Sequence, residues 1–228
     1  MRWSIVTGGA SGIGYAVAKA LIADGHKVIV VDQVPPPTNL DTEYFQADIG
    51  IPSDIGNFAA TIRGREIHDL VHCAAVGQWS LFTETSPEDW SRILRVNLEG
   101  TAGIVREVLP SMQHGGRIVL FASGTVFKGV AGMTAYTASK AGVIGFARSL
   151  SHEVGEKEIT VNVVSPGITR TPMIEEIKHT EAANIATRAI KRSAVPEDLI
   201  GPVRFLLSDA ASFITGQTMA VDGGSVKL

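Results

Sequence analysis

Short runs of β-branched and other apolar residues alternate with longer amphipathic stretches along almost the whole chain. The runs that predict strands are Ser4–Thr7, Val28–Asp32, Tyr44–Ala47, Asp69–His72, Arg117–Phe121, Thr160–Val164 and Thr218–Val221. The stretches that predict helices are Ile13–Ala23, Pro52–Arg63, Pro87–Leu109, Ala135–Gly155 and Pro196–Ser208. Several strand candidates are apolar throughout, as is typical of parallel strands buried on both faces. The pattern therefore predicts an α/β fold, a doubly wound parallel sheet of about seven strands with helices on both faces.

One connection between predicted strands departs from this alternation. Only the residues from Gln33 to Glu43 join the second strand to the third, and they include Pro35-Pro36-Pro37. A parallel crossover normally needs a dozen or more residues, usually with a helix. Consecutive prolines fix φ and lack amide donors, so no ordinary helix fits. We expect a proline loop in place of the helix after the second strand, leaving part of one sheet face thinly covered.

Length, composition and charge then exclude several classes of protein. The 228 residues fit one domain, expected to span 1–228, and we find no internal repeat or linker. The formal net charge of −3 and the lack of a Lys/Arg block argue against nucleic acid as a partner. No apolar run approaches the roughly 18 residues that span a bilayer, and no signal peptide precedes the first strand, so no membrane partner is expected. The single cysteine, Cys73, excludes an internal disulfide and fits a cytoplasmic location.

Glycine is over-represented, because its 24 residues make up about a tenth of the chain against a typical share of about 7%. Four of these glycines lie in one turn. The turn, Thr7-Gly8-Gly9-Ala10-Ser11-Gly12-Ile13-Gly14, follows the first strand and opens the first helix. Glycines there permit a tight turn, a close approach of the backbone to a pyrophosphate, and tight packing of helix on strand. The helix N-terminus offers free amides to the phosphates. This turn predicts a Rossmann-like dinucleotide site made by Gly8, Ser11, Gly12, Ile13 and Gly14.

The residue at the end of the second strand selects the cofactor. Asp32 lies 18 residues after Gly14, close to the offset of about 20 expected for a carboxylate that binds the adenosine ribose hydroxyls. A 2′-phosphate beside this carboxylate would be repelled. Neither the turn nor Gln33, which follows the acid, supplies a basic side chain to bind one. We therefore predict NAD, bound partly by Asp32 and Gln33, in preference to NADP.

Tyr136 and Lys140 lie four residues apart near the start of a predicted helix and hence on one face. A phenol with a pKa near 10 is a poor base at neutral pH. Lowering that pKa to about 7 requires about 4 kcal/mol, which an ammonium ~4 Å away supplies at an effective dielectric of ~20. A positively charged nicotinamide ring would add to the effect. The pair is therefore a candidate proton-transfer site.

With the glycine turn and this pair, the sequence resembles the short-chain dehydrogenase/reductase family from about Ser4 to Gly224. The family's Thr-Gly-x-x-x-Gly-x-Gly matches Thr7 to Gly14, and its Tyr-x-x-x-Lys falls on Tyr136 and Lys140. The resemblance implies a catalytic set of Asn97, Ser123, Tyr136 and Lys140. It also implies that the cofactor contacts Asp48, Ile49, Cys73, Ala74, Ala75, Tyr136, Lys140, Pro166, Gly167, Ile168 and Thr171. The ending from Gly216 to Gly224 also looks like that of the family.

Each catalytic residue has a role implied by the resemblance. Tyr136 would exchange the proton of the substrate hydroxyl while hydride moves to or from the nicotinamide, and Ser123 would hydrogen-bond the substrate oxygen. Lys140 would hold the nicotinamide ribose and lower the pKa of Tyr136. Asn97 would anchor a water that leads from Lys140 to solvent. Alternatively, Asn97 could mark a mid-helix kink whose polar groups are satisfied locally. Relatives usually assemble as tetramers, so a homo-oligomer, tetramer or dimer, is expected.

The sequence departs from the family at one motif. The family's Asn-Asn-Ala-Gly after the fourth strand appears here as His72-Cys73-Ala74-Ala75. Because the family's motif contacts the cofactor through its backbone, cofactor binding should survive the change of side chains. The lost asparagine side chains leave the local hydrogen bonding open. His68 and His72 share a strand face, but without acidic partners we predict no metal site.

The substrate pocket is the least defined part of the prediction. The family builds it after the fourth strand, after the catalytic serine and after the Pro-Gly turn, which here correspond to Gln78-Trp79, Thr125-Val126-Phe127 and Met173 to Thr187. The substrate residues predicted are Trp79, Ser123, Thr125 and Tyr136. Their mostly apolar surroundings favour a neutral or aromatic secondary alcohol or ketone, or a cyclic dihydrodiol. Trp79 and Phe127 could equally be packing or interface residues.

Two other functions remain open at this point. One is an NADPH-dependent carbonyl reductase, against which Asp32 argues. The other is a catalytically silent NAD-sensing protein on the same fold, since fold alone does not give function. A sensor would have no need of all four catalytic residues, which favours the NAD-dependent oxidoreductase.

Overall fold

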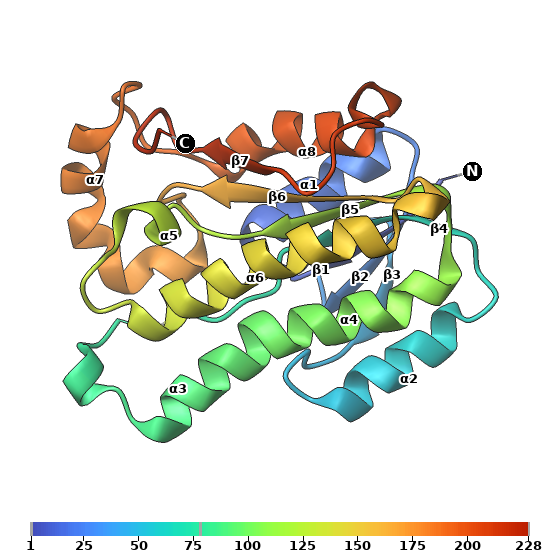
Figure 1. Ribbon diagram of the computed structural model, residues 1–228, viewed down its shortest axis with the longest axis horizontal. Helices are drawn as coiled ribbons and strands as arrows, with labels where there is room; N and C mark the ends of the chain where they lie inside the picture. The colour runs from blue at the N-terminus through green and yellow to red at the C-terminus, as the bar shows by residue number, and fades with distance from the viewer. Residues whose placement is uncertain (1, 78, 228) are drawn as a thin grey trace.

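The computed structural model describes residues 2–77 and 79–227, apart from the side chains of Glu176 and Lys178. Its strands form one parallel sheet in the order β3-β2-β1-β4-β5-β6-β7 (Figure 1). The strand bounds are Trp3–Thr7 (β1), Lys27–Asp32 (β2), Glu43–Gln46 (β3), Ile67–His72 (β4), Met112–Phe121 (β5), Thr160–Pro166 (β6) and Thr218–Val221 (β7). The structure thus confirms the predicted seven-stranded parallel sheet. It is one continuous sheet, which is the arrangement that the one-domain prediction requires.

Helices cover both faces of this sheet (Figure 1). Their bounds are Gly12–Ala23 (α1), Pro52–Ile62 (α2), Pro87–Leu94 (α3), Gly100–Val108 (α4), Thr125–Lys128 (α5), Thr134–Glu153 (α6), Glu181–Thr187 (α7) and Ile200–Leu207 (α8). Helices α2, α4 and α6 pack on one face, where Phe58 and Ile104 are fully buried with Leu70 and Ile118 of the strands. Helices α1 and α8 pack on the other. The doubly wound arrangement is therefore confirmed.

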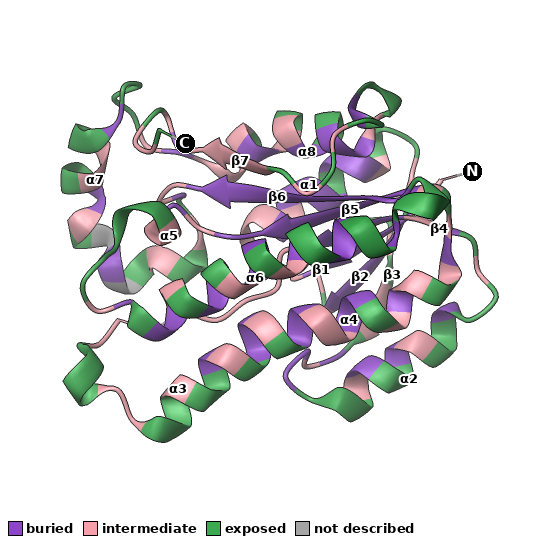
Figure 2. Cartoon of the chain, viewed as in Figure 1, coloured by how far each residue is buried: buried purple, intermediate pink, exposed green. Residues whose placement is uncertain are grey.

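Burial follows the two-faced packing of the sheet. All seven residues of β6 are buried, and β5 is buried from Gly116 to Phe121. Figure 2 shows the strands buried through the centre of the molecule, while the helices alternate between buried and exposed residues. Among residues 2–77 and 79–227, no helix is long and apolar enough to cross a bilayer.

The proline loop forms as predicted. Residues 33–42, all described, contain no helix, and most of them are exposed. The cover that a helix would give comes partly from the loop itself, because Leu40 packs against the α1 and α8 core together with Tyr44 of β3. The Gln46 side chain also donates to the Gln33 carbonyl (3.1 Å) across the ends of β2 and β3.

The helix predicted over Pro87–Leu109 is not continuous. It begins as expected at Pro87, with the Ser86 side chain accepting a hydrogen bond from the Asp89 amide (3.0 Å). Between α3 and α4, however, the segment Arg95–Glu99 winds as a π-helix. A π-turn inserts an extra residue into the α-helical ladder and is often found at functional sites. Helical segments outside the predicted helices include α5, the 3-10 turns over Pro172–Thr180, and α7.

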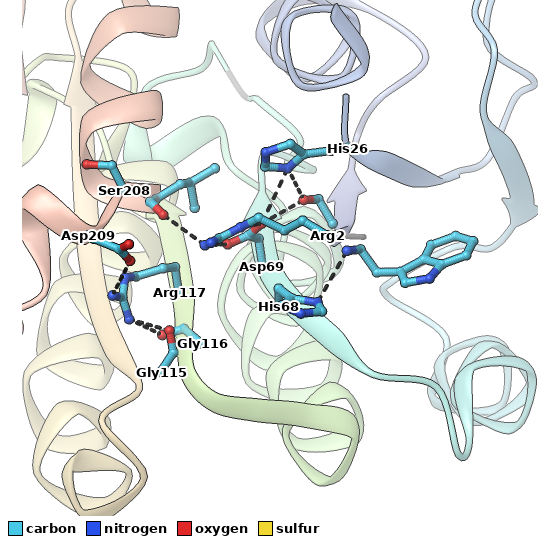
Figure 3. A network of polar contacts seen from close by, with 12 residues as sticks. Arg2, His26, His68, Asp69, Gly115, Gly116, Arg117, Ser208 and Asp209 are labelled. Atoms are coloured by element: carbon cyan, nitrogen blue, oxygen red, sulfur yellow. Dashed lines mark hydrogen bonds and ion pairs between the residues drawn. The ribbon is translucent and has the colours of Figure 1, made fainter. Parts of the chain in front are cut away.

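A polar network ties the strands together at their amino ends (Figure 3). Asp69 of β4 is fully buried and accepts two hydrogen bonds from the Arg2 guanidinium, at 2.8 and 2.6 Å, and one from Ser4 Oγ at 2.7 Å. Arg2 also donates to the Leu207 carbonyl (2.8 Å) at the end of α8. Since Asp69 is fully paired, its role here is structural. The carboxyl ends of the strands, at the opposite edge, remain as the place to look for a functional site.

Candidate active site

Two neighbouring cavities open at the carboxyl ends of the strands, which is where open α/β sheets bind ligands. The first, of about 360 Å³, lies over β1, β2 and β4, and the second, of about 430 Å³, lies over β5 and β6. Both are lined by Ile13, Cys73, Ala75, Thr171 and Met173. The cavities therefore meet beside the glycine turn and the segment that follows β4.

The glycine turn forms one wall of the first cavity. Gly8 and Gly12 have φ of +67° and +54°, in the left-handed region that favours glycine. A Cβ at Gly8 would lie 2.8 Å from the backbone of Ala74, and one at Gly14 would lie 2.2 Å from the carbonyl oxygen of Gly8. The turn thus fits tightly against the segment after β4. Its geometry is that of a backbone cradle with no room for side chains.

Asp32 lies at the end of β2 and on the wall of the first cavity. Its Oδ2 accepts a hydrogen bond from the Ala10 amide of the glycine turn (3.0 Å). The carboxylate is thereby held against the turn, and half-buried. Among the described residues that line this cavity there is no lysine or arginine. The electrostatic environment at this end of the site is therefore anionic.

The residues predicted to contact a cofactor divide between the two cavities. The first cavity is lined by Gly8, Ser11, Gly12, Ile13, Gly14, Asp32, Gln33, Ile49, Cys73, Ala74, Ala75 and Thr171. The second is lined by Ile13, Cys73, Ala75, Tyr136, Lys140, Pro166, Gly167, Ile168 and Thr171. Asp48 lines neither, and its Oδ1 accepts from the Gly50 amide at 2.7 Å. The structure brings all of the set except Asp48 to one continuous surface.

Three of the four candidate catalytic residues face the second cavity. Ser123 follows the end of β5, and Tyr136 and Lys140 lie one turn apart on α6. Burial raises the pKa of Tyr136 to about 12, although a hydrogen bond with Ser123 acts to lower it. Burial also lowers the pKa of Lys140 to about 8. Both groups are thus shifted toward their neutral forms by the loss of contact with water.

The orientation of Lys140 differs from the sequence expectation. Its ammonium donates to the Phe121 carbonyl (2.8 Å) and lies 5.9 Å from the ring centroid of Tyr136. Burial is the dominant effect on the pKa of the Tyr136 hydroxyl, and the group that acts to lower this pKa is Ser123. The predicted lowering of the Tyr136 pKa by Lys140 and a nicotinamide ring stays a prediction. The positive charge of a nicotinamide ring is the other source that the sequence argument named.

Asn97 holds neighbouring segments together and lines neither cavity. Lying in the π-helical segment, it accepts from the Val76 amide (2.8 Å) and donates to the Val76 carbonyl (2.9 Å). It also donates to Ser139 Oγ (3.1 Å), which in turn donates to the Tyr136 carbonyl (2.7 Å). Asn97 thus links the loop after β4 to the helix that carries Tyr136. Its predicted role as a water anchor stays a prediction.

His72, where the family has asparagine, is the centre of a directed chain of hydrogen bonds. Thr101 donates its hydroxyl proton to the Asn97 carbonyl (2.6 Å), so it must accept from His72 Nε2, 2.9 Å away. Nδ1 then accepts from the Thr7 hydroxyl (2.8 Å), which accepts from the Ala74 amide (3.3 Å). The network assigns the neutral Nε2–H tautomer. Burial, and less so the charge of Lys140, lowers the pKa of His72 to about 3.

Replacing His72 by asparagine is expected to lower the unfolding free energy by about 1–3 kcal/mol at neutral pH, because Thr7 or Thr101 loses its partner. The unfolded chain binds a proton on this histidine below about pH 6.5, while the folded chain does not until about pH 3. Stability should therefore fall as the pH drops through this window, and this part of the fall should be absent in His72→Asn. Urea denaturation from neutral pH to about pH 5 measures both effects.

The matched control for this substitution is His114→Asn. The His114 side chain is 66% exposed, and its replacement should change stability by no more than about 0.5 kcal/mol. It should also keep the acid sensitivity of the parent protein. An unaltered acid slope in His72→Asn would show that the imidazole of His72 is not held neutral by the fold.

The predicted substrate residues lie together in the second cavity. Trp79, Ser123, Thr125 and Tyr136 all line it, and so does much of the predicted segment from Met173 to Thr187. Val126 and Phe127 do not, and Gln78 lies outside the described residues. Lining residues that the sequence reasoning missed include Lys128, Val130, Met133 and Asp222. Lys128 directly follows the predicted segment Thr125-Val126-Phe127, and this was the one signal that could have indicated it.

Neither predicted histidine is placed as a metal ligand. His68 Nδ1 accepts from the Trp3 amide (3.3 Å), and both ring nitrogens of His72 are occupied by threonines. Within the described parts of the chain, no cluster of three or more His, Cys, Asp or Glu side chains could hold a metal ion.

Comparison with known proteins places these features in a family. The sequence matches the family described as Enoyl-(Acyl carrier protein) reductase over residues 8–226. The 3-oxoacyl-(acyl-carrier-protein) reductase FabG of Thermotoga maritima is 32% identical, in an alignment that covers 97% of this chain and 96% of the relative. Acetoacetyl-CoA reductase of an Acinetobacter species is 31% identical, with the same coverage.

Solved structures agree with these sequence relatives. A short-chain dehydrogenase/reductase of Brucella melitensis, titled glucose/ribitol dehydrogenase, superimposes with a TM-score of 0.92 at 31% identity, covering 100% of this chain and 97% of that one. Thermoplasma acidophilum aldohexose dehydrogenase gives a TM-score of 0.92 at 27% identity, covering 98% and 93%. With its parallel sheet and its glycine turn, the chain belongs to the short-chain dehydrogenase/reductase family, whose members are oxidoreductases that act on hydroxyl and keto groups.

Proposed function

We propose that this protein is an NAD-dependent oxidoreductase that transfers hydride between the cofactor and a secondary alcohol or ketone. The observation that carries the choice of NAD is the electrostatics of the first cavity. Asp32 is held there by the Ala10 amide, and the described lining residues include no lysine or arginine. A 2′-phosphate at this place would face a carboxylate with no compensating cation, and juxtaposed like charges cost several kcal/mol.

The residues of the first cavity fit a dinucleotide. Added Cβ atoms at Gly8 and Gly14 would overlap neighbouring backbone, so glycine at both positions allows the tight turn that a pyrophosphate site needs. The start of α1 directs unpaired amides to the same place, and the Ser11 side chain makes no capping bond to them. When bound, NAD would supply the acceptor or donor of the hydride.

The residues of the second cavity would carry out the proton chemistry. Tyr136 would give a proton to the substrate oxygen or take one from it, and Ser123, which follows β5, would hydrogen-bond the same oxygen. Lys140 would hold the nicotinamide ribose by turning from the Phe121 carbonyl that it contacts now. Asn97 would keep the loop after β4 and helix α6 in register through its bonds to Val76 and Ser139.

The lining of the second cavity, and not the substrate of any one relative, indicates the kind of substrate. Trp79, Val130, Met133, Ile174 and Ile177 give it largely apolar walls. The relatives are named for 3-oxoacyl-(acyl-carrier-protein), acetoacetyl-CoA and aldohexose substrates, which differ too much to be transferred. We propose a small substrate with an apolar or aromatic body and a secondary hydroxyl or keto group.

The test of the cofactor assignment is a change of cofactor preference on replacing Asp32. We expect the parent protein to prefer NAD over NADP by about 100-fold or more in kcat/KM. In Asp32→Ser this ratio should shrink at least about tenfold, because the repelling carboxylate is gone. Steady-state rates with both cofactors, on a panel of secondary alcohols, measure the ratio.

Asp41→Ser is the matched control, since Asp41 is an exposed acid of the proline loop that lines neither cavity. It should leave the cofactor ratio unchanged. A parent protein that prefers NADP would instead support an NADPH-dependent carbonyl reductase. NAD binding without turnover across a broad panel would support an NAD-sensing protein. The predictions of a homo-oligomer and of a cytoplasmic location stay as made from the sequence.

A further inference from the structure

The second cavity has largely apolar walls with a few polar residues among them. Ser123, Tyr136 and Lys140 line it, and the proposed reaction takes place there. Lys128, an exposed residue at the end of α5, lines the same cavity. A ligand that meets both the reacting residues and Lys128 would need two polar groups.

The Lys128 ammonium lies where three segments distant in the sequence converge. It donates to Thr187 Oγ1 (3.2 Å), the last residue of α7, and to the Ser225 hydroxyl, which follows β7. Figure 1 shows α5, α7 and the C-terminal segment on the same side of the molecule. An ammonium has three N–H donors, so at least one is left for a ligand.

The acid among the described residues that line this cavity already has partners of its own. Asp222 accepts from the amides of Gly224, Ser225 and Val226 at 3.0, 3.1 and 2.7 Å. Among described residues, by contrast, the partners of Lys128 are neutral hydroxyl groups and it forms no ion pair. Its positive charge is therefore available to an anion in the cavity.

We propose that Lys128, held in place by the hydroxyl groups of Thr187 and Ser225 that accept from it, binds a carboxylate of the substrate in the second cavity. The inference rests on the proposed function and names its substrate class: a hydroxy acid or keto acid with an apolar spacer between the two polar groups. A single cation matches a singly charged carboxylate better than a phosphate dianion. Charge-assisted hydrogen bonds of this kind are among the stronger ones in proteins.

The experiment compares matched substrates in matched variants. Secondary-alcohol acids of increasing length, such as 5-hydroxyhexanoate, are each paired with the neutral methyl ester and assayed with NAD. For the best acid we expect kcat/KM to exceed that of its ester by about 10- to 100-fold. Lys128→Met keeps the length of the side chain but removes its charge, and should bring this ratio to about 1 with the ester rate unchanged. Lys128→Arg should keep most of the preference, and the remote exposed control Lys157→Met all of it.

Two results would overturn the proposal. One is a parent protein with no preference for acids over esters. The other is an equal loss for acid and ester in Lys128→Met, which would mean that Lys128 serves only to hold α5, α7 and the C-terminal segment together.

A failure of the proposed function would look different, as no turnover of any pair. Calorimetric titration with hexanoate and hexanamide then decides the matter without catalysis. Binding of hexanoate but not hexanamide, lost in Lys128→Met, would uphold the carboxylate site. Equal binding of both, or of neither, would reject it.

Discussion

Replacing Tyr136 by phenylalanine is expected to lower kcat by roughly 10³- to 10⁴-fold, because the variant lacks the hydroxyl that exchanges a proton with the substrate. The fold should survive the change. The ring of Tyr136 packs against Ile93, Met133 and Ala135, and phenylalanine fills the same volume. Affinity for NAD should change little, since the first cavity is not lined by this residue. Single-turnover rates and fluorescence titration with NADH measure the two quantities separately.

The acid–base properties of Tyr136 add a further requirement to this expectation. Burial holds its pKa at about 12, and Lys140, with its pKa lowered to about 8, points to the Phe121 carbonyl. A raised pKa favours the protonated phenol, which suits proton donation, the direction of carbonyl reduction. Alcohol oxidation needs a lower pKa, which requires a cation close to the hydroxyl. The pH profile of the parent protein in the two directions should differ accordingly.

Tyr15→Phe is the control for loss of a tyrosine hydroxyl elsewhere. Tyr15 lies on α1, is half-buried and lines neither cavity, so its variant should retain the parent rate. If Tyr136→Phe kept more than about a tenth of the parent kcat, the proton would have to come from another group, and the assignment of Tyr136 would be wrong.

The features of the fold that the sequence predicts correctly are those that local chemistry determines. The proline loop formed because Pro35-Pro36-Pro37 excludes a helix whatever surrounds it. The π-helical turn at Arg95–Glu99, in which Asn97 bonds to Val76 of a distant segment, was not predicted. Hydrophobic periodicity identified helical residues on both sides of it but carries no information on a single inserted residue.

The candidate active site also divides into features that the sequence predicts and features that only the fold creates. Backbone positions set by the glycine turn, and the pair Tyr136 and Lys140 on one helix face, follow from spacing along the chain. The direction of the Lys140 side chain does not, because a carbonyl at the end of β5 competes for its ammonium. Lys128 was not predicted to line the cavity, for a related reason. Its significance arises from Thr187 and Ser225, which only the fold brings to it.

Replacing Gly14 by alanine is expected to raise the Kd for NAD at least about 100-fold and to lower the unfolding free energy by about 3 kcal/mol. The added Cβ would lie 2.2 Å from the carbonyl oxygen of Gly8 and 3.2 Å from the Cα of Gly9. Both neighbours are backbone atoms of the turn, which is itself confined at Gly8 by the backbone of Ala74 (2.8 Å from a Cβ there). The turn can therefore accommodate alanine only by opening, which displaces the amides that would meet the pyrophosphate.

Gly56→Ala is the matched control for Gly14→Ala, because Gly56 is also a helical glycine but has open space where its Cβ would lie. Alanine there should stabilise the protein by up to about 1 kcal/mol through helix propensity alone and leave NAD affinity unchanged. Calorimetric titration with NAD and urea denaturation of both variants give the comparison. Gly14→Ala with parent affinity would mean that the turn is not the cofactor cradle. Weak binding in both variants would point instead to a general loss of native structure. The contrast between two glycines of the same conformation thus separates the close approach that a cofactor site needs from the flexibility that any glycine provides.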